Sequence, residues 1–148
     1  MTGNRFLASL LLAALGGCGS DPSPTAFPTA FARRSCGPTD APSIAIDLST
    51  VTQQQEPIAP PLVRMIVYQS REAAAGRTWT VDEPFTNGAA TYCETELSCE
   101  NAPRGSIRLD PTTSAGIVSG EVELRFPKKG MIRGPFRAAW NDRSILCG

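Results

Sequence analysis

The feature that most limits the fold of this chain is a two-residue alternation in its C-terminal third. Within residues 116–126, the apolar set Val118, Val122, Leu124 and Phe126 alternates with the charged set Glu121, Glu123 and Arg125. Side chains of a strand point alternately to opposite faces, so this segment predicts a strand with one buried and one solvated face. A turn over residues 127–130 leads to a second apolar segment at residues 131–140, which predicts a hairpin.

Further short strands are expected ahead of this hairpin. The segments with strand composition are residues 43–48, 62–68, 77–81, 89–93 and 105–110, with an Asn87-Gly88 turn signal between the third and the fourth. In the first, Ile44, Ile46 and Leu48 share one face. The helix candidate, residues 71–75, is short. About eight short strands separated by Gly and Pro predict an all-β domain, an antiparallel β-sandwich or small barrel.

Cysteine usage adds covalent constraints. The chain has five cysteines, Cys18, Cys36, Cys93, Cys99 and Cys147. An odd count in a secreted protein calls for a separate role for one of them, and the position of Cys18 provides it. The other four allow three pairings, of which we favour Cys93–Cys99, a tight local loop, and Cys36–Cys147, which joins the first strand to the last. A metal site is the alternative, but Cys-x5-Cys does not match the common zinc spacing.

The N-terminus has the layout of a secretory signal. Arg5 precedes an apolar run over residues 6–15, which is about half the length that a helix needs to cross a bilayer. The segment Leu15-Gly16-Gly17-Cys18 follows and resembles the lipobox of bacterial lipoproteins, in which the cysteine becomes the mature N-terminus. The resemblance implies cleavage before Cys18, a diacylglyceryl group on its thiol, and acylation of the freed amine.

The same resemblance implies an address. Two or three acyl chains hold a protein permanently on a membrane, whereas a single chain does not. Gly19 stands where an aspartate often retains Gram-negative lipoproteins in the inner membrane, so the outer membrane is expected. We therefore expect a signal peptide over residues 1–17, a lipidated cysteine with a flexible, disordered Pro-rich tether over residues 18–35, and the all-β domain over residues 36–148.

The body of the chain is similar to small uncharacterised lipoprotein domains of bacterial envelopes, a likeness that implies no activity. The absence of histidine excludes Ser-His-Asp and Cys-His catalysis, and no glycine-rich phosphate loop is present. With 14 basic and 14 acidic residues, the chain is near neutral, which argues against nucleic acid as a partner. No cofactor, no metal and no enzymatic activity are expected.

Three groups of residues are candidate sites, and each also has a structural interpretation. The acidic group is Glu94, Glu96, Glu100 and Asp110, a solvated surface, a calcium site or the carboxylates of a hydrolase. The basic group is Lys128, Lys129 and Arg133, which either contact anionic lipid and cell-wall groups or prevent edge-to-edge strand pairing. The aromatic pair is Trp79 and Trp140, core residues or a stacking platform for sugars.

The favoured function is that of a membrane-anchored envelope lipoprotein, a non-catalytic structural or interaction module. The lipid anchor makes the membrane one partner, and an unknown envelope protein or glycan is the other. The first alternative is a glycan- or peptidoglycan-binding module that uses Trp79 or Trp140. A carboxylate-dependent hydrolase is the third hypothesis.

Overall fold

The computed structural model describes residues 23–54, 56–111 and 114–147, so the signal peptide and Cys18 lie outside the described residues. Nine strands make up most of this part. They are β1 (Thr29–Cys36), β2 (Pro42–Ser49), β3 (Leu62–Val67), β4 (Thr78–Asp82), β5 (Gly88–Thr95), β6 (Ser98–Asn101), β7 (Arg104–Leu109), β8 (Ile117–Phe126) and β9 (Gly130–Asn141). A 3-10 turn (Pro38–Asp40) follows β1, and one short helix, α1 (Arg71–Ala74), precedes β4. No helix in these three ranges is long and apolar enough to cross a lipid bilayer.

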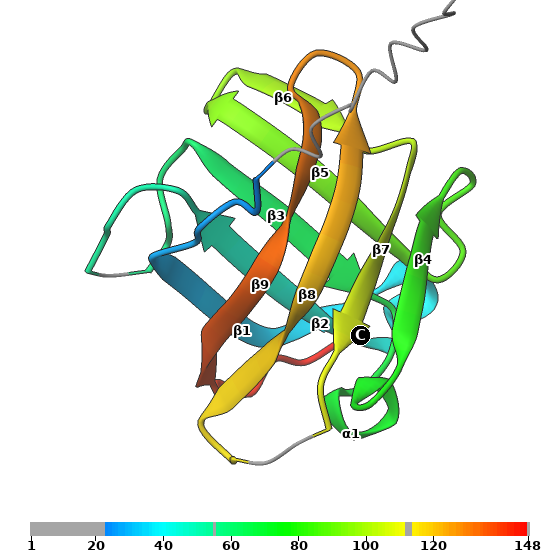
Figure 1. Ribbon diagram of the computed structural model, residues 1–148. Coiled ribbons are helices and arrows are strands. Elements are labelled where there is room, and N and C mark those ends of the chain that lie inside the picture. The colour runs from blue at the N-terminus through cyan, green and yellow to red at the C-terminus, as the bar shows by residue number, and fades with distance from the viewer. Residues whose placement is uncertain (1–22, 55, 112–113, 148) are drawn as a thin grey trace, which may run out of the picture.

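The strands form one curled sheet in the order β4-β7-β8-β9-β1-β2-β3-β5-β6. In Figure 1, β7, β8 and β9 cross in front of β1, β2 and β3, so the two halves of the sheet face each other around the core. Among the paired strands of the described chain, β1 and β9 alone are parallel, with Phe31 opposite Ala139. The expectation of a purely antiparallel arrangement is therefore wrong at this pair.

The alternation in the C-terminal third is confirmed by burial. In β8, the side chains of Val118, Val122, Leu124 and Phe126 are buried, whereas Glu121, Glu123 and Arg125 are exposed. Ile44, Ile46 and Leu48 of β2 are fully buried on the facing half of the sheet. Phe126 also contacts Tyr92 of β5, with 5.9 Å between the ring centroids. These side chains form the hydrophobic core between the two halves.

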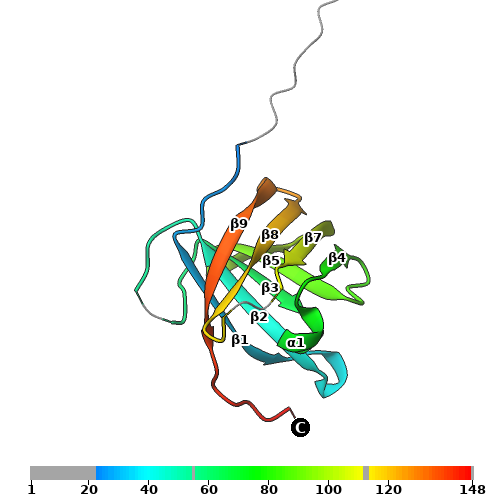
Figure 2. The same ribbon diagram turned by 60° about the horizontal axis from the view of Figure 1, so that its bottom comes forward.

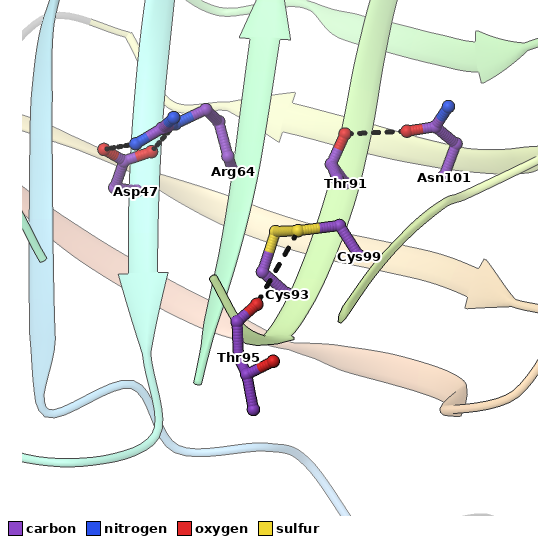
Figure 3. The surroundings of a disulfide bond; sticks show 7 residues. All are labelled: Asp47, Arg64, Thr91, Cys93, Thr95, Cys99 and Asn101. Atoms are coloured by element: carbon purple, nitrogen blue, oxygen red, sulfur yellow. Dashed lines mark hydrogen bonds and ion pairs between the residues drawn. A yellow bond between two sulfur atoms is a disulfide. The ribbon is translucent and has the colours of Figure 1, made fainter. Parts of the chain in front are cut away.

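Strand β2 is buried on both faces, and its outer face holds Asp47, which is 1% exposed. Oδ2 of Asp47 accepts a hydrogen bond from Arg33 of β1 and Oδ1 accepts one from Arg64 of β3, each at 2.7 Å. Figure 3 shows the Arg64 contact, with the Cys93–Cys99 bridge farther along the same face. Burial alone raises the pKa of Asp47, but the hydrogen bonds and charges of both arginines outweigh it and hold the pKa below its ordinary value.

Residues well before Cys36 belong to the sheet, so the expectation of a flexible tether up to residue 35 is wrong for residues 29–35. Residues 29–35 belong to β1, which is hydrogen-bonded to β2 on one side and β9 on the other. Ahead of β1, Phe27 packs against the core, and the backbone N–H of Thr25 donates to the carbonyl of Arg133 at 2.6 Å. Proline content suggested a flexible segment, but the prolines lie before β1 and leave its backbone free to pair.

Both favoured disulfides are present, Cys36–Cys147 and Cys93–Cys99. The second closes the β5–β6 hairpin, whose second strand was not identified from the sequence. The expected turn at Asn87-Gly88 does not join paired strands: β4 pairs with β7, and β5 pairs with β3 and β6. The short α1 lies between β3 and β4 and carries the chain across to the other half of the sheet.

Candidate functional site

A cleft of about 880 Å³ opens at the end of the molecule where α1, the β7–β8 connection and the C-terminal segment meet. This end lies in the lower part of Figure 2. The residues on which its chemistry depends are Arg34, Ser70, Arg71, Gly116, Trp140 and Asp142. The Cys36–Cys147 bridge borders it and fastens the C-terminal segment, which follows β9, to the end of β1. We call this end of the molecule the cleft end.

One wall of the cleft is held by Arg71. Helix α1 starts after Ser70, whose side chain accepts a hydrogen bond from the N–H of Ala73 and caps the helix. From the first position of α1, the guanidinium group of Arg71 donates to three carbonyls of the β7–β8 connection, those of Ser114, Ala115 and Ile117, at 2.5–2.9 Å. These hydrogen bonds fix α1 against the β7–β8 connection, so hydrogen bonds as well as packing hold this wall of the cleft in place.

Trp140 of β9 forms the aromatic part of the cleft. Its ring is partly buried, and the guanidinium carbon of Arg71 lies 4.8 Å from the ring centroid, a cation–π contact. Asp142 accepts a hydrogen bond from Nε1 of Trp140 at 3.4 Å. It also forms an ion pair with Arg34, at 2.9 Å. The cleft thus combines an indole ring, two guanidinium groups and the carboxylates of Asp40, Glu72 and Asp142, an arrangement that can stack on an apolar ring and hydrogen-bond to hydroxyl or amide groups.

The structure separates the two tryptophans. Trp79 lies on β4, outside the lining of the cleft, and packs partly buried against the core. Its Nε1 donates to the carbonyl of Ala74 at 3.2 Å, as that of Trp140 does to Asp142, so the two rings differ in their place and not in the bonding of this atom. Of the two aromatic candidates, Trp140 therefore has the access that a binding residue requires.

The acidic candidates are divided between separate elements. Glu100 of β6 accepts hydrogen bonds from the backbone N–H groups of Lys128 and Lys129, each at 2.8 Å. Asp110, after β7, accepts from Arg108 at 2.8 Å and from Ser119 at 3.0 Å. Nowhere in residues 23–54, 56–111 and 114–147 do three or more metal-ligating side chains gather in one place. Glu100 and Asp110 have structural roles in these contacts.

The basic candidates lie on the final hairpin, away from the cleft. Lys128 and Lys129 are exposed in the β8–β9 turn, and Nζ of Lys129 lies 4.9 Å from the ring centroid of Tyr92. Arg133 lies further along β9, where its carbonyl receives the N–H of Thr25. The turn therefore packs against the β5–β6 hairpin and adjoins the N-terminal segment.

Sequence reasoning found Trp140 but missed Arg34, Arg71 and Asp142. These residues come from β1, α1 and the C-terminal segment, and no local spacing relates them. The one available signal was Ser70 before Arg71-Glu72, a helix N-cap pattern too short to draw attention.

The sequence matches no protein-family model, and comparisons with curated proteins and with solved structures give no match. The observations that bear on function are thus the chemistry of the cleft and the positions of residues 23–28 and of the segment after β9.

Proposed function

We propose that this chain is a lipid-anchored envelope protein, attached through Cys18 to the outer membrane, that presents its cleft to a partner without catalysing a reaction. The observation that carries the proposal is how soon after Cys18 the chain is bonded to the domain. Ser23 is five residues after Cys18, and Thr25 is already hydrogen-bonded to β9. An extended chain spans at most about 3.5 Å per residue, so the anchoring residue lies within about 18 Å of Ser23.

The position of the cleft supports a presenting role. In Figure 2, residues 23–28 leave the domain on the side of the β8–β9 turn, and the C-terminal segment lies on the opposite side. Ile145 and Cys147 of this segment line the cleft. A short tether on one side keeps that side near the membrane and leaves the cleft end open to a partner.

A non-catalytic role is supported by the bonding of three polar groups in the cleft. Arg71 is bonded to backbone carbonyls, Arg34 is paired with Asp142, and the Ser70 hydroxyl caps α1. The chain contains no histidine that could serve as a general base beside a serine. The arrangement suits recognition better than proton transfer.

The anchor is tested by mass spectrometry of the protein from its own cell envelope. We expect a mature N-terminus at Cys18 and the added mass of two or three acyl chains, because one chain does not hold a protein stably on a membrane. Cys18→Ser should abolish incorporation of labelled fatty acid. The matched control is Cys93→Ser with Cys99→Ser, which removes two cysteines from the domain and should leave acylation intact. An unmodified wild-type product would refute the anchor.

A second candidate function, binding of cell-wall glycan, is favoured by the place of Trp140 in the cleft. The indole ring is the group that stacks on sugars, and Arg34 and Asp142 beside it can bond to hydroxyl groups. Purified sacculi should pellet residues 18–148 at both low and high salt, because stacking is not screened by ions.

The glycan hypothesis predicts unequal effects for the two tryptophans. Trp140→Ala should weaken sedimentation with sacculi at least about tenfold, a loss of about 1.4 kcal/mol, whereas Trp79→Phe should leave it unchanged. If wild-type protein stays in the supernatant, or if both variants bind as wild type does, the cleft does not bind this glycan through Trp140. The partner is then sought by crosslinking in the intact envelope.

A further inference from the structure

The tip of the β5–β6 hairpin presents a leucine to solvent. Leu97 is 99% exposed, and the Cys93–Cys99 bridge holds the hairpin closed beneath it. Single exposed apolar side chains are common on protein surfaces, so exposure alone carries no argument. Leu97 matters because of its neighbours and because it lies on the side of the domain where the N-terminal segment emerges.

The β8–β9 turn lies beside this hairpin. The carboxylate of Glu100, three residues after Leu97, accepts the backbone N–H groups of Lys128 and Lys129 at 2.8 Å. The side chain of Lys129 lies over Tyr92 of β5, which ties the two hairpins together a second time. We call the surface formed by residues 94–98 and 127–129 the hairpin end. It carries one apolar tip and two exposed lysines, with Glu94 and Glu96 as its exposed acids.

The N-terminal segment reaches the domain on the same side. Thr25 is hydrogen-bonded to Arg133, four residues beyond Lys129, and a side chain on Gly134 would collide with the carbonyl of Thr25. This close contact holds residues 25–27 against β9. In both Figure 1 and Figure 2, the blue N-terminal segment ends nearer to the β8–β9 turn than to the C-terminal segment.

We propose that the hairpin end rests on the surface of the membrane that holds the anchor, with Leu97 entering the headgroup region and Lys128 and Lys129 contacting lipid phosphates. This inference rests on the proposed anchor at Cys18. A tether of at most about 18 Å to Ser23 is shorter than the width of a domain of this size, about 35 Å. The side from which the tether emerges is therefore the side that meets the lipid.

A lipid surface fits the chemistry of the hairpin end. Leu97 is the apolar tip of one hairpin, and Lys128 and Lys129 lie on the neighbouring turn. At an interface the apolar part enters the acyl boundary and the ammonium groups stay at the level of the phosphates, an attraction that Glu94 and Glu96 oppose in part. The carboxylate of Glu100 is bonded to the backbone amides of Lys128 and Lys129, so it also holds the β8–β9 turn beside the β5–β6 hairpin. The attraction of Lys128 and Lys129 requires anionic lipid and weakens with salt.

The test compares two leucines that are equally exposed at opposite ends of the molecule. Leu97 and Leu146 are each 99% exposed, and Leu146 precedes Cys147 at the cleft end. Each is replaced separately by tryptophan in the full mature chain. Its Cys18 thiol is coupled to a maleimide lipid, because the other four cysteines are bonded in disulfides. The proteins are placed in vesicles of phosphatidylcholine and phosphatidylglycerol at about 4:1 that contain a headgroup spin label, and quenching is measured against the parent chain.

We expect the added fluorescence of Leu97→Trp to be quenched at least about threefold more than that of Leu146→Trp, because quenching requires contact with the headgroup layer. Lys128→Glu with Lys129→Glu should reduce the quenching of Leu97→Trp, and phosphatidylcholine alone should do the same. Equal quenching of the two positions, or stronger quenching of Leu146→Trp, would overturn the proposal and leave the hairpin end available to a protein partner.

The coupled lipid separates this inference from the proposed function. It supplies an anchor at Cys18 whether or not cells acylate that residue. Quenching in this anchored chain therefore tests the orientation of the domain separately from the lipidation of Cys18. Native acylation is measured independently on protein from the envelope. Circular dichroism of the variants verifies that each surface substitution leaves the fold intact.

Discussion

Replacing Cys36 and Cys147 by serine is expected to lower the free energy of unfolding by about 4–5 kcal/mol. The bridge joins residues 111 positions apart, so it removes the entropy of a very long loop from the unfolded chain. Small domains are stable by about 5–15 kcal/mol in total, and the loss should bring this one near its limit. Guanidinium denaturation of the oxidised wild type and of the variant measures the difference.

The second disulfide provides the matched control. Cys93 and Cys99 are separated by 6 positions, and the same loop-entropy relation gives about 2–2.5 kcal/mol for their replacement by serine. The difference between the two pairs, about 2.5 kcal/mol, depends only on loop length. Equal losses for both pairs would show that native contacts, and not loop closure, account for the stabilisation. The Cys36–Cys147 variant should also free the C-terminal segment that borders the cleft.

Asp47→Asn is expected to lower the free energy of unfolding by about 2–3 kcal/mol at pH 7. The amide keeps the shape of the side chain but loses the charge that Arg33 and Arg64 neutralise, and its NH2 group opposes one of their donors. Breaking a fully buried ion pair costs about 3–5 kcal/mol. The arginine side chains here are 33% and 42% exposed, so water compensates them in part and the loss is smaller.

The lowered pKa of Asp47 gives this substitution a pH signature. A carboxyl group whose pKa is lower in the folded state stabilises the protein above its unfolded pKa, about 3.9, and that contribution disappears as the pH falls through the folded value. The stability difference between wild type and Asp47→Asn should thus be constant above about pH 5 and shrink below pH 4. Asp142→Asn is the control. That carboxylate pairs with Arg34 but is 68% exposed, so its replacement should change the free energy of unfolding little. If the stability difference between wild type and Asp47→Asn did not change with pH, the pKa of Asp47 would not be lowered in the folded state.

The strands of the C-terminal third could be predicted because their pattern is local. β8 has one face in the core and one in water, so its burial repeats every second residue and is written directly in the sequence. The two disulfides were also accessible, since removing Cys18 from the count left few pairings. β6 was missed because its residues Ser98–Asn101 are all polar or cysteine and show no alternation. It is held by pairing with β5 and by the Cys93–Cys99 bridge.

β1 and the cleft depend on contacts between distant parts of the chain. The segment Thr29–Cys36 contains Arg33 and Arg34 together and lies among prolines, so its composition resembles a linker. It is a strand because β2 and β9 satisfy its backbone on both sides. The burial of Asp47 follows from the same arrangement, since alternation in β2 alone would expose it. Arg34, Arg71 and Trp140 meet only once the sheet has curled, which no spacing in the sequence records.

Under the anchor proposed at Cys18, the parallel pairing of β1 with β9 has a mechanical consequence. Tension applied at the anchor reaches the contact between Thr25 and Arg133 first and then pulls along β1, within the sheet and not at its edge. Hydrogen bonds between β1 and its two neighbours then share the load, whereas peeling an edge strand would break them one at a time. Should β1 slide, the tension passes at Cys36 through the disulfide to Cys147, so the strand cannot lengthen the tether by more than its own eight residues. For the anchor proposed at Cys18, the disulfide thus limits how far the tether can lengthen under load to the length of β1.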